Sequence, residues 1–488
     1  MTMTHEFSAA IFDFSDEAIR QAAAAGRLLA MEIEFNRACN YRCPYCYAGE
    51  PQVELPCMSS EEIDSVIRQA AALGVRKLVV LGGEPLLYQG LGEKLALIAE
   101  CGMVAEVFTN GALLTPELAA LFYRYRARVV LKFNSLRPEV QERMTGVPGA
   151  LDKALRALEI LRQSGYAKPG LLAASSVICS ENVDDMPSLW RWLRIHDIIP
   201  YFEIMTPQGR MLQNRYLHVA PRRLREVFEE IAAIDREFGR DWEPQPPLVG
   251  GKCFRHLYSC LVNASGEVLP CVGVTTVLGN IRERPVAQIL SESSVIRDLK
   301  DYRNKLKGPC RRCAKSEECY GCRGAAYQMT GDYLGSDPLC WLNADRQHEI
   351  RFLPHDARGL LPHGAPMGMI DTVLQSGEET LLQAEIRPDN RFLDSAGIFD
   401  RAAVPELAAQ AAAAAEGFRE DGRIVPGMLV GISNVAFAAD IVRGDRLIVA
   451  IRETGRLNEW HIVKFRIVRE TDGAQLASGD LKLCVSAS

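Results

Sequence analysis

The sequence lacks the features that would place the protein in a membrane or on nucleic acid. No apolar run reaches the roughly 18 to 20 residues that a membrane-spanning helix requires. Residues 1–14 lack the basic start and the apolar stretch of a secretory signal peptide. The formal net charge is −6, so no excess of basic residues marks a nucleic-acid-binding face. These absences predict a cytoplasmic protein that binds neither membranes nor nucleic acids.

Cysteine, by contrast, is abundant. The 488 residues suffice for about three domains, and 15 of them are cysteines. In a reducing compartment so many thiols are better explained as metal ligands than as disulfides. Eleven fall into two groups along the chain. The other four are expected to be small buried hydrophobic residues, and they are Cys57, Cys101, Cys179 and Cys484.

The first group is Cys39, Cys43 and Cys46, at CxxxCxxC spacing directly after a stretch with the character of a buried strand. A tight loop at the carboxyl end of a strand can point three thiolates at one centre. Three ligands around a four-iron cube leave one iron open, where a small molecule can chelate. The alternative is a structural zinc site, but such a site uses four ligands, and a fourth is missing locally.

This loop resembles the cluster loop of the radical S-adenosylmethionine (SAM) superfamily, in which an aromatic such as Tyr45 precedes the last cysteine. A second motif, Gly82-Gly83-Glu84-Pro85, follows the next apolar run, and in that family it grips the methionine amino group. The resemblance implies a reducible 4Fe-4S cluster on the three cysteines, with SAM on its open iron. It also implies that one electron cleaves SAM to a 5′-deoxyadenosyl radical that abstracts hydrogen.

Strand-like and helix-like runs alternate from about residue 31 to 205, after a lead helix near residues 16–30. The predicted strands cover residues 31–35, 77–81, 104–108, 128–133, 171–178 and 198–205. Six strand–helix units predict an α/β fold, with a parallel sheet and helices outside. The count fits the partial six-unit, TIM-like barrel of the family, where chemistry gathers at the carboxyl ends of strands.

Polar residues at these strand ends are candidate SAM ligands. Asn110 follows the third strand, although its Thr-Asn-Gly segment also suits a simple turn. After the fourth strand the family often has Ser-x-Asp-Gly, and here Lys132 and Asn134 stand at the Ser and Asp positions. Lys132 and Ser135 are therefore candidates for the ribose and carboxylate contacts. Glu203, in the sixth strand, either faces the substrate or is a paired structural carboxylate.

The second group holds eight cysteines and follows a proline-rich break at residues 244–247. They are Cys253, Cys260, Cys271, Cys310, Cys313, Cys319, Cys322 and Cys340. Their spacing resembles the SPASM extension of radical SAM enzymes, although the last short spacing is one residue shorter. Eight thiolates satisfy two further 4Fe-4S clusters at four each. Two zinc ribbons are the alternative.

The SPASM resemblance also implies which cysteines share a cluster. It assigns Cys253, Cys260, Cys271 and Cys322 to the cluster nearer the active site. It assigns Cys310, Cys313, Cys319 and Cys340 to an outer cluster. A fully ligated cluster moves electrons rather than binding substrate, and an external donor such as flavodoxin or ferredoxin is expected. Val272 stands where sulfatase-maturing members carry an Asp, so oxidation by their route lacks its base.

Beyond Cys340 the pattern changes to one long helix followed by strand-like runs at 445–452, 459–468 and 474–485. Residues 358–488 resemble the α+β hot-dog fold of hydroxyacyl-carrier-protein dehydratases, with a Leu-Pro-His opening at His363 and a Glu-x-x-Ala-Gln helix at Glu406. That family pairs a histidine with a carboxylate. Glu406 matches the carboxylate, whereas the usual Gly-His-Phe-Pro segment is missing near residues 392–398. His363 is the candidate substitute, and a non-catalytic dimerisation or docking scaffold is the alternative.

The sequence thus predicts a lead segment (1–30), a radical SAM core (31–245), a SPASM domain (246–350) and a hot-dog domain (356–488). The expected activity is hydrogen abstraction from an acyl thioester, carried by an acyl carrier protein or CoA, in specialised metabolism. A ribosomal-peptide or protein maturase is the rival. Many of those carry a compact leader-binding domain, for which the 38 residues before Cys39 are too few. A homodimer through the hot-dog domain is expected.

Overall fold

The computed structural model describes residues 11–49, 56–377, 379–419 and 422–485. The chain divides into two compact units. The first contains Met1–Gln328 and Tyr333–Glu349, and the second contains Met329–Asp332 and Ile350–Ser488. Within the described ranges, no helix is both long and apolar enough to cross a membrane.

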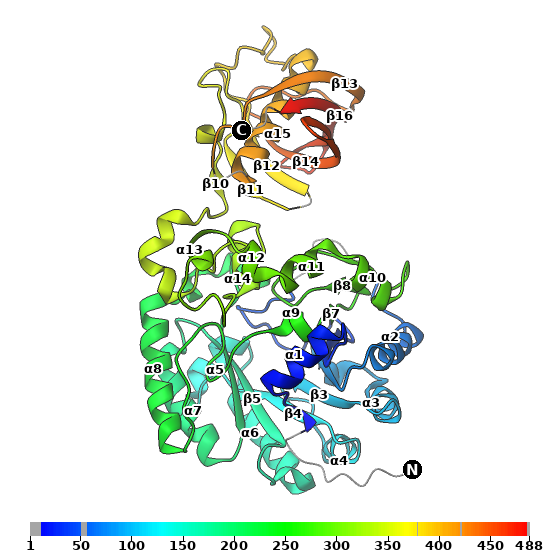
Figure 1. Cartoon of the computed structure of the whole chain (residues 1–488), viewed down its shortest axis with the longest axis vertical. Coiled ribbons are helices and arrows are strands. Elements are labelled where there is room, and N and C mark those ends of the chain that lie inside the picture. The colour runs from blue at the N-terminus through cyan, green and yellow to red at the C-terminus, as the bar shows by residue number, and fades with distance from the viewer. Residues whose placement is uncertain (1–10, 50–55, 378, 420–421, 486–488) are drawn as a thin grey trace. The chain divides into compact units, whose positions relative to one another are not determined.

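The first unit is built on a sheet of nine strands in the order β6-β5-β4-β3-β2-β1-β7-β8-β9 (Figure 1). The first six strands are parallel. Their bounds are β1 (Ala30–Glu34), β2 (Lys77–Leu81), β3 (Val104–Thr109), β4 (Arg128–Lys132), β5 (Leu172–Ile178) and β6 (Ile199–Ile204). They lie within one or two residues of the predicted strands, because each is an apolar run bounded by turn or helix-start residues.

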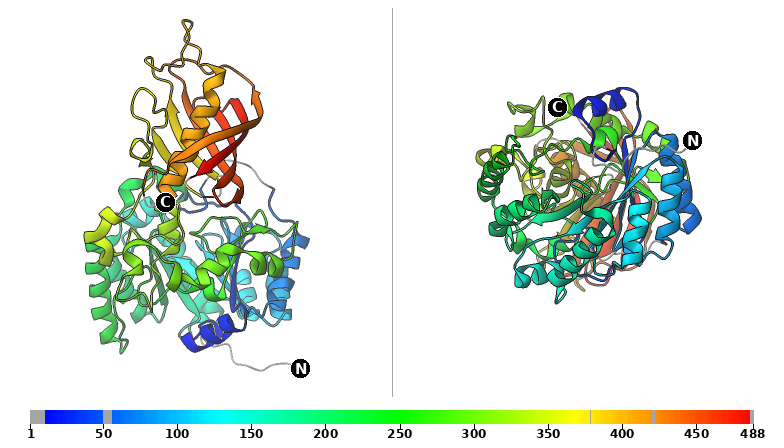
Figure 2. Two further views of the ribbon diagram at one scale, coloured as in Figure 1. Left: turned by 45° about the horizontal axis from the view of Figure 1, so that its top comes forward. Right: turned by 90° about the horizontal axis from the view of Figure 1, so that it is seen from below.

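Helices cover the outer side of this parallel sheet (Figures 1 and 2). They are α2 (Ser60–Ala72), α3 (Leu91–Glu100), α4 (Pro116–Arg124), α5 (Pro138–Thr145), α6 (Ala150–Leu161), α7 (Met186–Ile195) and α8 (Pro221–Glu237). The lead helix α1 (Asp16–Ala24) is shorter than predicted. It ends before Gly26, whose φ of +65° leaves the helical region, and Leu29 already pairs its backbone with Tyr258.

The second cysteine group continues the same sheet rather than forming a separate layer. Strand β7 (Leu261–Val262) pairs in parallel with β1, and β8 (Glu267–Leu269) and β9 (Gly279–Asn280) follow antiparallel. Short helices carry the rest of this segment. They are α9 (Arg255–Tyr258), α10 (Val286–Glu292), α11 (Ser294–Lys300), α12 (Tyr302–Lys305), α13 (Gly308–Arg311) and α14 (Arg323–Thr330).

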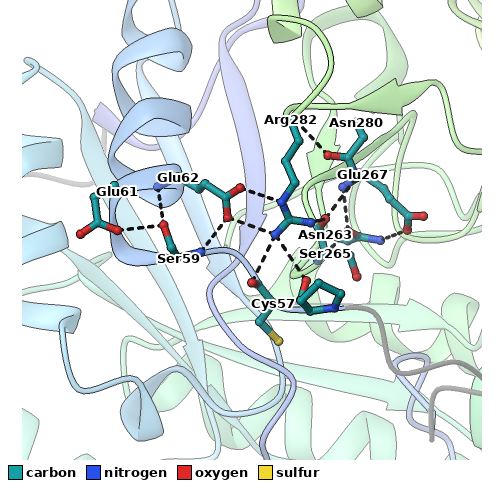
Figure 3. Close-up of polar contacts among 10 residues, drawn as sticks. Cys57, Ser59, Glu61, Glu62, Asn263, Ser265, Glu267, Asn280 and Arg282 are labelled. Atoms are coloured by element: carbon teal, nitrogen blue, oxygen red, sulfur yellow. Dashed lines mark hydrogen bonds and ion pairs between the residues drawn. The ribbon is translucent and has the colours of Figure 1, made fainter.

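A polar clamp fastens this segment to the start of α2 (Figure 3). Ser59 and Glu62 form a capping box, in which each side chain accepts from the other residue's backbone N–H. Arg282 donates to both carboxylate oxygens of Glu62, at 2.6 and 3.0 Å, and to the carbonyl of Ser265 at 2.9 Å. The clamp therefore joins residues more than 200 positions apart within the first unit.

The second unit is a seven-stranded antiparallel sheet in the order β10-β11-β12-β14-β15-β16-β13, with helix α15 (Val404–Arg419) against it (Figure 2, left). The strands are β10 (His355–Asp356), β11 (Thr372–Gln375), β12 (Glu379–Glu385), β13 (Gly427–Phe437), β14 (Arg446–Leu457), β15 (Trp460–Arg469) and β16 (Gln475–Val485). The three predicted runs are β14 to β16. The other four strands were not predicted, and glycines at 427 and 431 weaken the strand signal of β13.

Candidate active sites

The loop of Cys39, Cys43 and Cys46 lies at the carboxyl end of β1 and touches the glycine motif through its backbone. The N–H of Gly83 donates to the carbonyl of Asn36 at 2.9 Å, and that of Glu84 donates to Ala38 at 2.7 Å. A Cβ added at Gly83 would lie 2.1 Å from the Ala38 oxygen. Only glycine permits this approach, so the motif positions the cysteine loop by backbone contact.

A second backbone contact holds the opposite side of the loop. The carbonyl of Cys46 accepts from the N–H of Arg210 at 3.0 Å, and a Cβ at Gly209 would lie 2.4 Å from that carbonyl oxygen. The side-chain amide of Asn214 donates to the carbonyl of Pro44 at 3.1 Å. The segment after β6 therefore closes on the cysteine loop, at a turn that requires glycine because its φ is +59°.

Glu84 and Asn110 form one buried network with the loop. The Glu84 carboxylate accepts from the Thr109 hydroxyl at 2.6 Å and from the Asn110 N–H at 2.8 Å. The Asn110 amide donates to the side chain of Asn40 at 2.7 Å. Burial raises the pKa of Glu84, while these hydrogen bonds oppose the rise. The predicted ligands thus stabilise the loop, and their contact with SAM stays a prediction.

The segment after β4 reaches the cysteine loop through Tyr45. The Tyr45 hydroxyl contacts the Asn134 amide at 3.0 Å, and the Lys132 Nζ lies 5.2 Å from the centre of the Tyr45 ring. Burial lowers the pKa of Lys132, and the nearby carboxylate of Glu203 opposes this. The Ser135 hydroxyl donates to Asp185 at 2.5 Å. The role predicted for Ser135 as a SAM ligand stays a prediction.

Both cysteine groups line one cavity of about 310 Å³ in the first unit. Its wall includes Cys39, Cys43, Cys46, Cys253, Cys271 and Cys322. Five of the predicted SAM-site residues also line it, namely Gly82, Gly83, Glu84, Asn110 and Lys132. Pro85 and Ser135, which are both described, lie outside its wall. The volume is at the lower end of the roughly 300 to 1,000 Å³ of small-molecule sites.

The cavity also holds Glu32 and Arg255, which the sequence did not single out, and Glu203, which it did. Glu32 of β1 is 3% exposed and pairs with the Arg255 guanidinium. Burial raises the pKa of Glu32, while Glu32 is the main cause that raises the pKa of Arg255. Glu203 is exposed to the cavity and, among the described residues, has no ion-pair partner. This position favours a role toward a ligand over a structural one.

Close backbone contact also brings two cysteines of the second group together. A Cβ at Gly273 would lie 2.6 Å from the Gly324 Cα, so the segments after Cys271 and Cys322 touch. Burial raises the pKa of Cys322, and the smaller causes include the charges of Cys253 and Cys271. Cys260 is 1% exposed and lies just before β7, outside the cavity wall.

Three of the remaining cysteines of the second group, Cys310, Cys319 and Cys340, lie near Asp337. Its N–H donates to the Cys310 sulfur at 3.4 Å, and its carboxylate accepts from the Cys322 N–H at 2.7 Å. Burial raises the pKa of Cys340, and the smaller causes include the charges of Asp337, Cys310 and Cys319. Asp337 therefore lies between the two sets that the SPASM resemblance implies. The assignment of individual ligands stays a prediction.

The four other cysteines follow the expected burial only in part. Cys179 is buried, with its sulfur 3.6 Å from that of Met205. Cys101 and Cys484 are half-buried, and Cys57 is exposed. The prediction of a buried hydrophobic residue is wrong for Cys57, because its segment runs over the surface beside the Arg282 clamp (Figure 3).

The second unit has its own cavity, of about 180 Å³, beside α15. His363 and Glu406 both line it. The Glu406 carboxylate accepts from the Gln410 amide at 2.9 Å, and the Gln410 oxygen accepts from the Met369 N–H at 2.9 Å. The Leu-Pro-His opening and the Glu-x-x-Ala-Gln helix thus meet at one site. The catalytic role of His363 and Glu406 stays a prediction.

Family models match three parts of the chain. The Radical SAM superfamily matches residues 33–193, the SPASM iron-sulfur cluster-binding domain matches 253–314, and the ApeP-like model, described as ApeP dehydratase, matches 355–487. The chain is a radical SAM/SPASM protein with a dehydratase-like domain. Its fold is a parallel radical SAM sheet with a separate antiparallel sheet.

Curated relatives align with the radical SAM and SPASM parts. An AdoMet-dependent heme synthase of Methanosarcina barkeri is 26% identical over 347 residues, which cover 65% of this chain and 96% of that protein. A PqqA peptide cyclase of Granulibacter bethesdensis is 26% identical over 348 residues, covering 67% and 90%. The crystal structure of Streptococcus suis SuiB bound to S-adenosylmethionine has a TM-score of 0.52 at 16% identity, covering 68% and 84%. That likeness shows the fold alone.

The residues of the radical SAM/SPASM unit fit iron-sulfur clusters. Arg323 is 3% exposed, and its Nε and Nη2 have no hydrogen-bond partner among the described residues. The Nε2 of His256 is buried in the same way, and both side chains line the cavity beside Cys253 and Cys322. The buried Asp337 carboxylate offsets part of the Arg323 charge. A cluster on four thiolates carries net negative charge and would also satisfy the two unused donors.

The arrangement of the side chains does not suit a site for a single metal ion. In the described part of the chain, no three His, Cys, Asp or Glu side chains gather closely enough to hold one metal ion. In a four-iron cube each thiolate binds its own iron, so the ligands surround the cube instead of meeting at a point.

Proposed function

We propose that the first unit reductively cleaves SAM and abstracts a hydrogen atom from a substrate held in the 310 Å³ cavity. Cys39, Cys43 and Cys46 would hold the SAM cluster. When bound, that cluster supplies the electron that yields the 5′-deoxyadenosyl radical. The observation that carries the proposal is the shared cavity, because it joins the SAM-cluster cysteines to Cys253, Cys271 and Cys322 without an intervening layer.

The chain's own residues would prepare this site for SAM and for the substrate. Gly82 and Gly83 fix the cysteine loop, and Glu84 presents a buried carboxylate to the methionine amino group. Lys132 and Arg255 offer cations to a bound carboxylate or phosphate, while Glu203 offers an unpaired carboxylate to the substrate. The aromatic and apolar wall excludes water from a reactive radical. The net reaction is an oxidation if the inner auxiliary cluster accepts the electron.

We further propose three 4Fe-4S clusters and the domain boundaries 31–245, 246–350 and 356–488. The separation of Tyr333–Glu349 from the Ile350–Ser488 unit supports the last boundary. Anaerobically reconstituted protein should contain about twelve irons per chain. With dithionite and SAM it should release 5′-deoxyadenosine, and flavodoxin or ferredoxin should replace dithionite.

A triple variant tests the cluster assignment. Cys39→Ala/Cys43→Ala/Cys46→Ala should retain about eight irons and release no 5′-deoxyadenosine. The half-buried Cys101 lies outside both groups, so Cys101→Ala should keep about twelve irons and full release. About four irons in the unsubstituted protein would contradict the two auxiliary clusters. Zinc in place of iron would contradict the radical mechanism.

The substrate class follows from the dehydratase-like domain. We propose an acyl thioester on an acyl carrier protein or CoA, because His363 and Glu406 line one cavity together with alanines of α15. A 3-hydroxyacyl thioester should lose water in the presence of the protein. Glu406→Gln should slow this at least about a hundredfold if the carboxylate moves a proton, whereas Glu459→Gln on a β-turn should not. Unchanged dehydration would favour the scaffold alternative.

A peptide substrate is the second candidate, since curated relatives include PqqA peptide cyclases. An isotope-transfer experiment distinguishes the two candidate substrates. Deuterium transfer into 5′-deoxyadenosine from a labelled acyl thioester supports the first, and transfer only from a labelled peptide supports the second.

A homodimer through the second unit is also proposed. Strand β13 is at the sheet edge, and Met428, Val430 and Ile432 on it are at least half exposed. An apolar edge strand is a ready pairing surface. Met428→Asp/Ile432→Asp should convert a dimer to a monomer in light scattering, whereas Leu155→Asp on α6 should not. A monomer before any substitution would contradict the proposal.

A further inference from the structure

Two buried side chains donate hydrogen bonds to cysteine sulfurs of the second group. The Tyr320 hydroxyl donates to the Cys253 sulfur at 3.3 Å, and the Asn343 side-chain amide donates to the Cys310 sulfur at 3.4 Å. Backbone N–H groups also donate to sulfurs of this group, but a side-chain donor can be removed by a single substitution. The SPASM resemblance places Cys253 in the inner set and Cys310 in the outer set, so the two donors serve different sets.

Packing fixes the position of Tyr320. The residue is 3% exposed, and its ring centre lies 4.2 Å from that of His256 and 5.3 Å from that of Tyr302. The ring of Phe254, the residue after Cys253, lies 5.8 Å away. Burial raises the pKa of Tyr320, so the phenol keeps its proton and acts as a donor. The chain therefore holds a phenol O–H against the Cys253 sulfur.

Hydrogen bonds fix the position of Asn343. The residue is 2% exposed, and its backbone N–H donates to the carbonyl of Cys340 at 3.0 Å. Its side-chain amide donates to the carbonyl of Asp337 at 2.8 Å as well as to the Cys310 sulfur. A carbonyl oxygen only accepts, so this bond identifies the amide nitrogen as the atom that faces both partners. Asn343 therefore presents a donor to the Cys310 sulfur.

A hydrogen bond to a cluster sulfur makes the cluster easier to reduce, because it stabilises the extra negative charge of the reduced state. We propose that Tyr320 and Asn343 are positioning residues that raise the reduction potentials of two different auxiliary clusters. Tyr320 acts through the Cys253 sulfur, and Asn343 acts through the Cys310 sulfur. This inference rests on the proposed three-cluster assignment. When bound, the clusters supply electron transfer, and the two side chains set how readily each cluster is reduced.

Potentiometric titration followed by EPR tests the proposal on the full chain. The Cys39→Ala/Cys43→Ala/Cys46→Ala protein is the background, because it should retain only the two auxiliary clusters. Tyr320→Phe keeps the ring and removes the hydroxyl, so it should lower one of the two potentials. The one-electron equilibrium should change about three- to tenfold, which is about 30 to 60 mV at 59 mV per tenfold. Asn343→Leu should lower the other potential by a similar amount.

Two matched variants control for changes in packing. Tyr302→Phe removes a phenol hydroxyl from the same cluster of rings, and Gln347→Leu removes an amide that donates to the carbonyl of Pro338 at 2.8 Å. Within the part of the chain that the structure describes, neither side chain donates to a cysteine sulfur, so both potentials should stay unchanged. Every variant should hold about eight irons before its potentials are compared. If Asn343→Leu does not, Asn343→Ala takes its place.

The outcomes separate this inference from the proposed function. About eight irons with unchanged potentials in both Tyr320→Phe and Asn343→Leu overturn the inference and leave the auxiliary clusters standing. An unchanged potential in only one of these variants overturns the role of that residue. A shift of the same potential by both overturns the assignment of the two donors to different clusters. About four irons or fewer in the background protein refute the pair of auxiliary clusters, and this inference with it.

Discussion

The cysteine-lined cavity of the first unit is shaped by backbone contacts, whereas the cavity beside α15 in the second unit owes its space to small side chains. At Gly83 and Gly209 an added Cβ would lie 2.1 and 2.4 Å from a carbonyl oxygen of the cysteine loop. Along α15 four of the lining residues are alanines, between Glu406 near one end of the helix and Glu416 near the other. Substitution of Gly83 or Gly209 should therefore disrupt the first cavity. Substitution of an alanine that lines the second cavity should leave the fold intact but reduce the size of ligand that fits.

Charge distinguishes the two cavities as well. Beside Cys322 the Arg323 guanidinium is buried with two unused donor nitrogens. Beside α15, Glu416 is paired with two arginines and Glu453 with His461. The first cavity thus holds buried donor nitrogens without partners, while the carboxylates of Glu416 and Glu453 in the second cavity each have a cationic or imidazole neighbour. Iron-sulfur clusters in the first cavity, and the acyl chain that we propose for the second, would account for this difference.

The largest effect is expected at Gly83. Gly83→Ala should prevent the cysteine loop from closing, because the Cβ would meet the Ala38 carbonyl at 2.1 Å. Iron content should fall from about twelve to about eight, and 5′-deoxyadenosine release should cease. Gly359→Ala is the control, since nothing lies within 4 Å of its Cβ position. Full iron content in Gly83→Ala would contradict the claim that backbone contact at Gly83 holds the cysteine loop in place.

The second-largest effect is expected from removing the positive charge of Arg323. Arg323→Gln should lower the reduction potential of the inner auxiliary cluster, because a lost positive charge destabilises the more negative reduced state. A shift of about 59 mV corresponds to a tenfold change in a one-electron equilibrium. Arg312→Gln, on an exposed side chain beside the outer cysteines, should change no potential by that amount. Potentiometric titration followed by EPR measures both. Equal potentials in wild type and Arg323→Gln would argue against an anion beside Arg323.

The two sites also differ in how well the sequence predicts them, because the first is built from local motifs and the second from residues on separate strands. Cys39, Cys43 and Cys46 lie within eight residues of one another and Gly82 and Gly83 are neighbours, so each motif is local and was predictable, as were the six strands. Arg255 and Arg323 were missed, although each lies within two residues of a cysteine and that position was a usable signal. Whether Ser135 contacts SAM depends on how Asp185 is placed, and no local pattern specifies that.

The second site was predicted only at its helix. His461 and Glu453 belong to two strands whose register a sequence does not reveal, and each looks like an ordinary polar residue of an exposed sheet face. The available signal was weak. His461 stands at a position where the alternation of β15 points inward, with Val463 and Phe465 buried on the same side. Strand β13, which lines the same cavity, was missed because its glycines resemble a loop.

A smaller effect should follow from filling the second cavity. Ala413→Leu adds three carbon atoms to the lining beside the chain path, so acyl thioesters long enough to pass it should bind about tenfold more weakly. Short thioesters should bind as before. The thermal midpoint of the second unit should change little, because the added atoms enter open space. An equal loss for short and long chains would mean that the chain does not pass Ala413.

The smallest effect concerns the clamp of Figure 3, which joins the second cysteine group to the barrel. Glu62→Gln should lower the free energy of unfolding by about 0.5 kcal/mol, because Glu62 and Arg282 are partly exposed and water screens their attraction.

The hydrogen bond from Arg282 lowers the pKa of Glu62 below its ordinary 4.5. The carboxylate is therefore charged more readily in the folded state, and its stabilisation is fully present above pH 4.5. It is lost as the pH falls through the lowered folded pKa. Chemical denaturation at pH 7 and pH 3 should give a smaller wild-type-minus-variant difference at pH 3. The control Glu93→Gln, at an exposed residue of α3, should show no difference at either pH. A difference that grows toward acid would mean that Glu62 is held by something other than its charge.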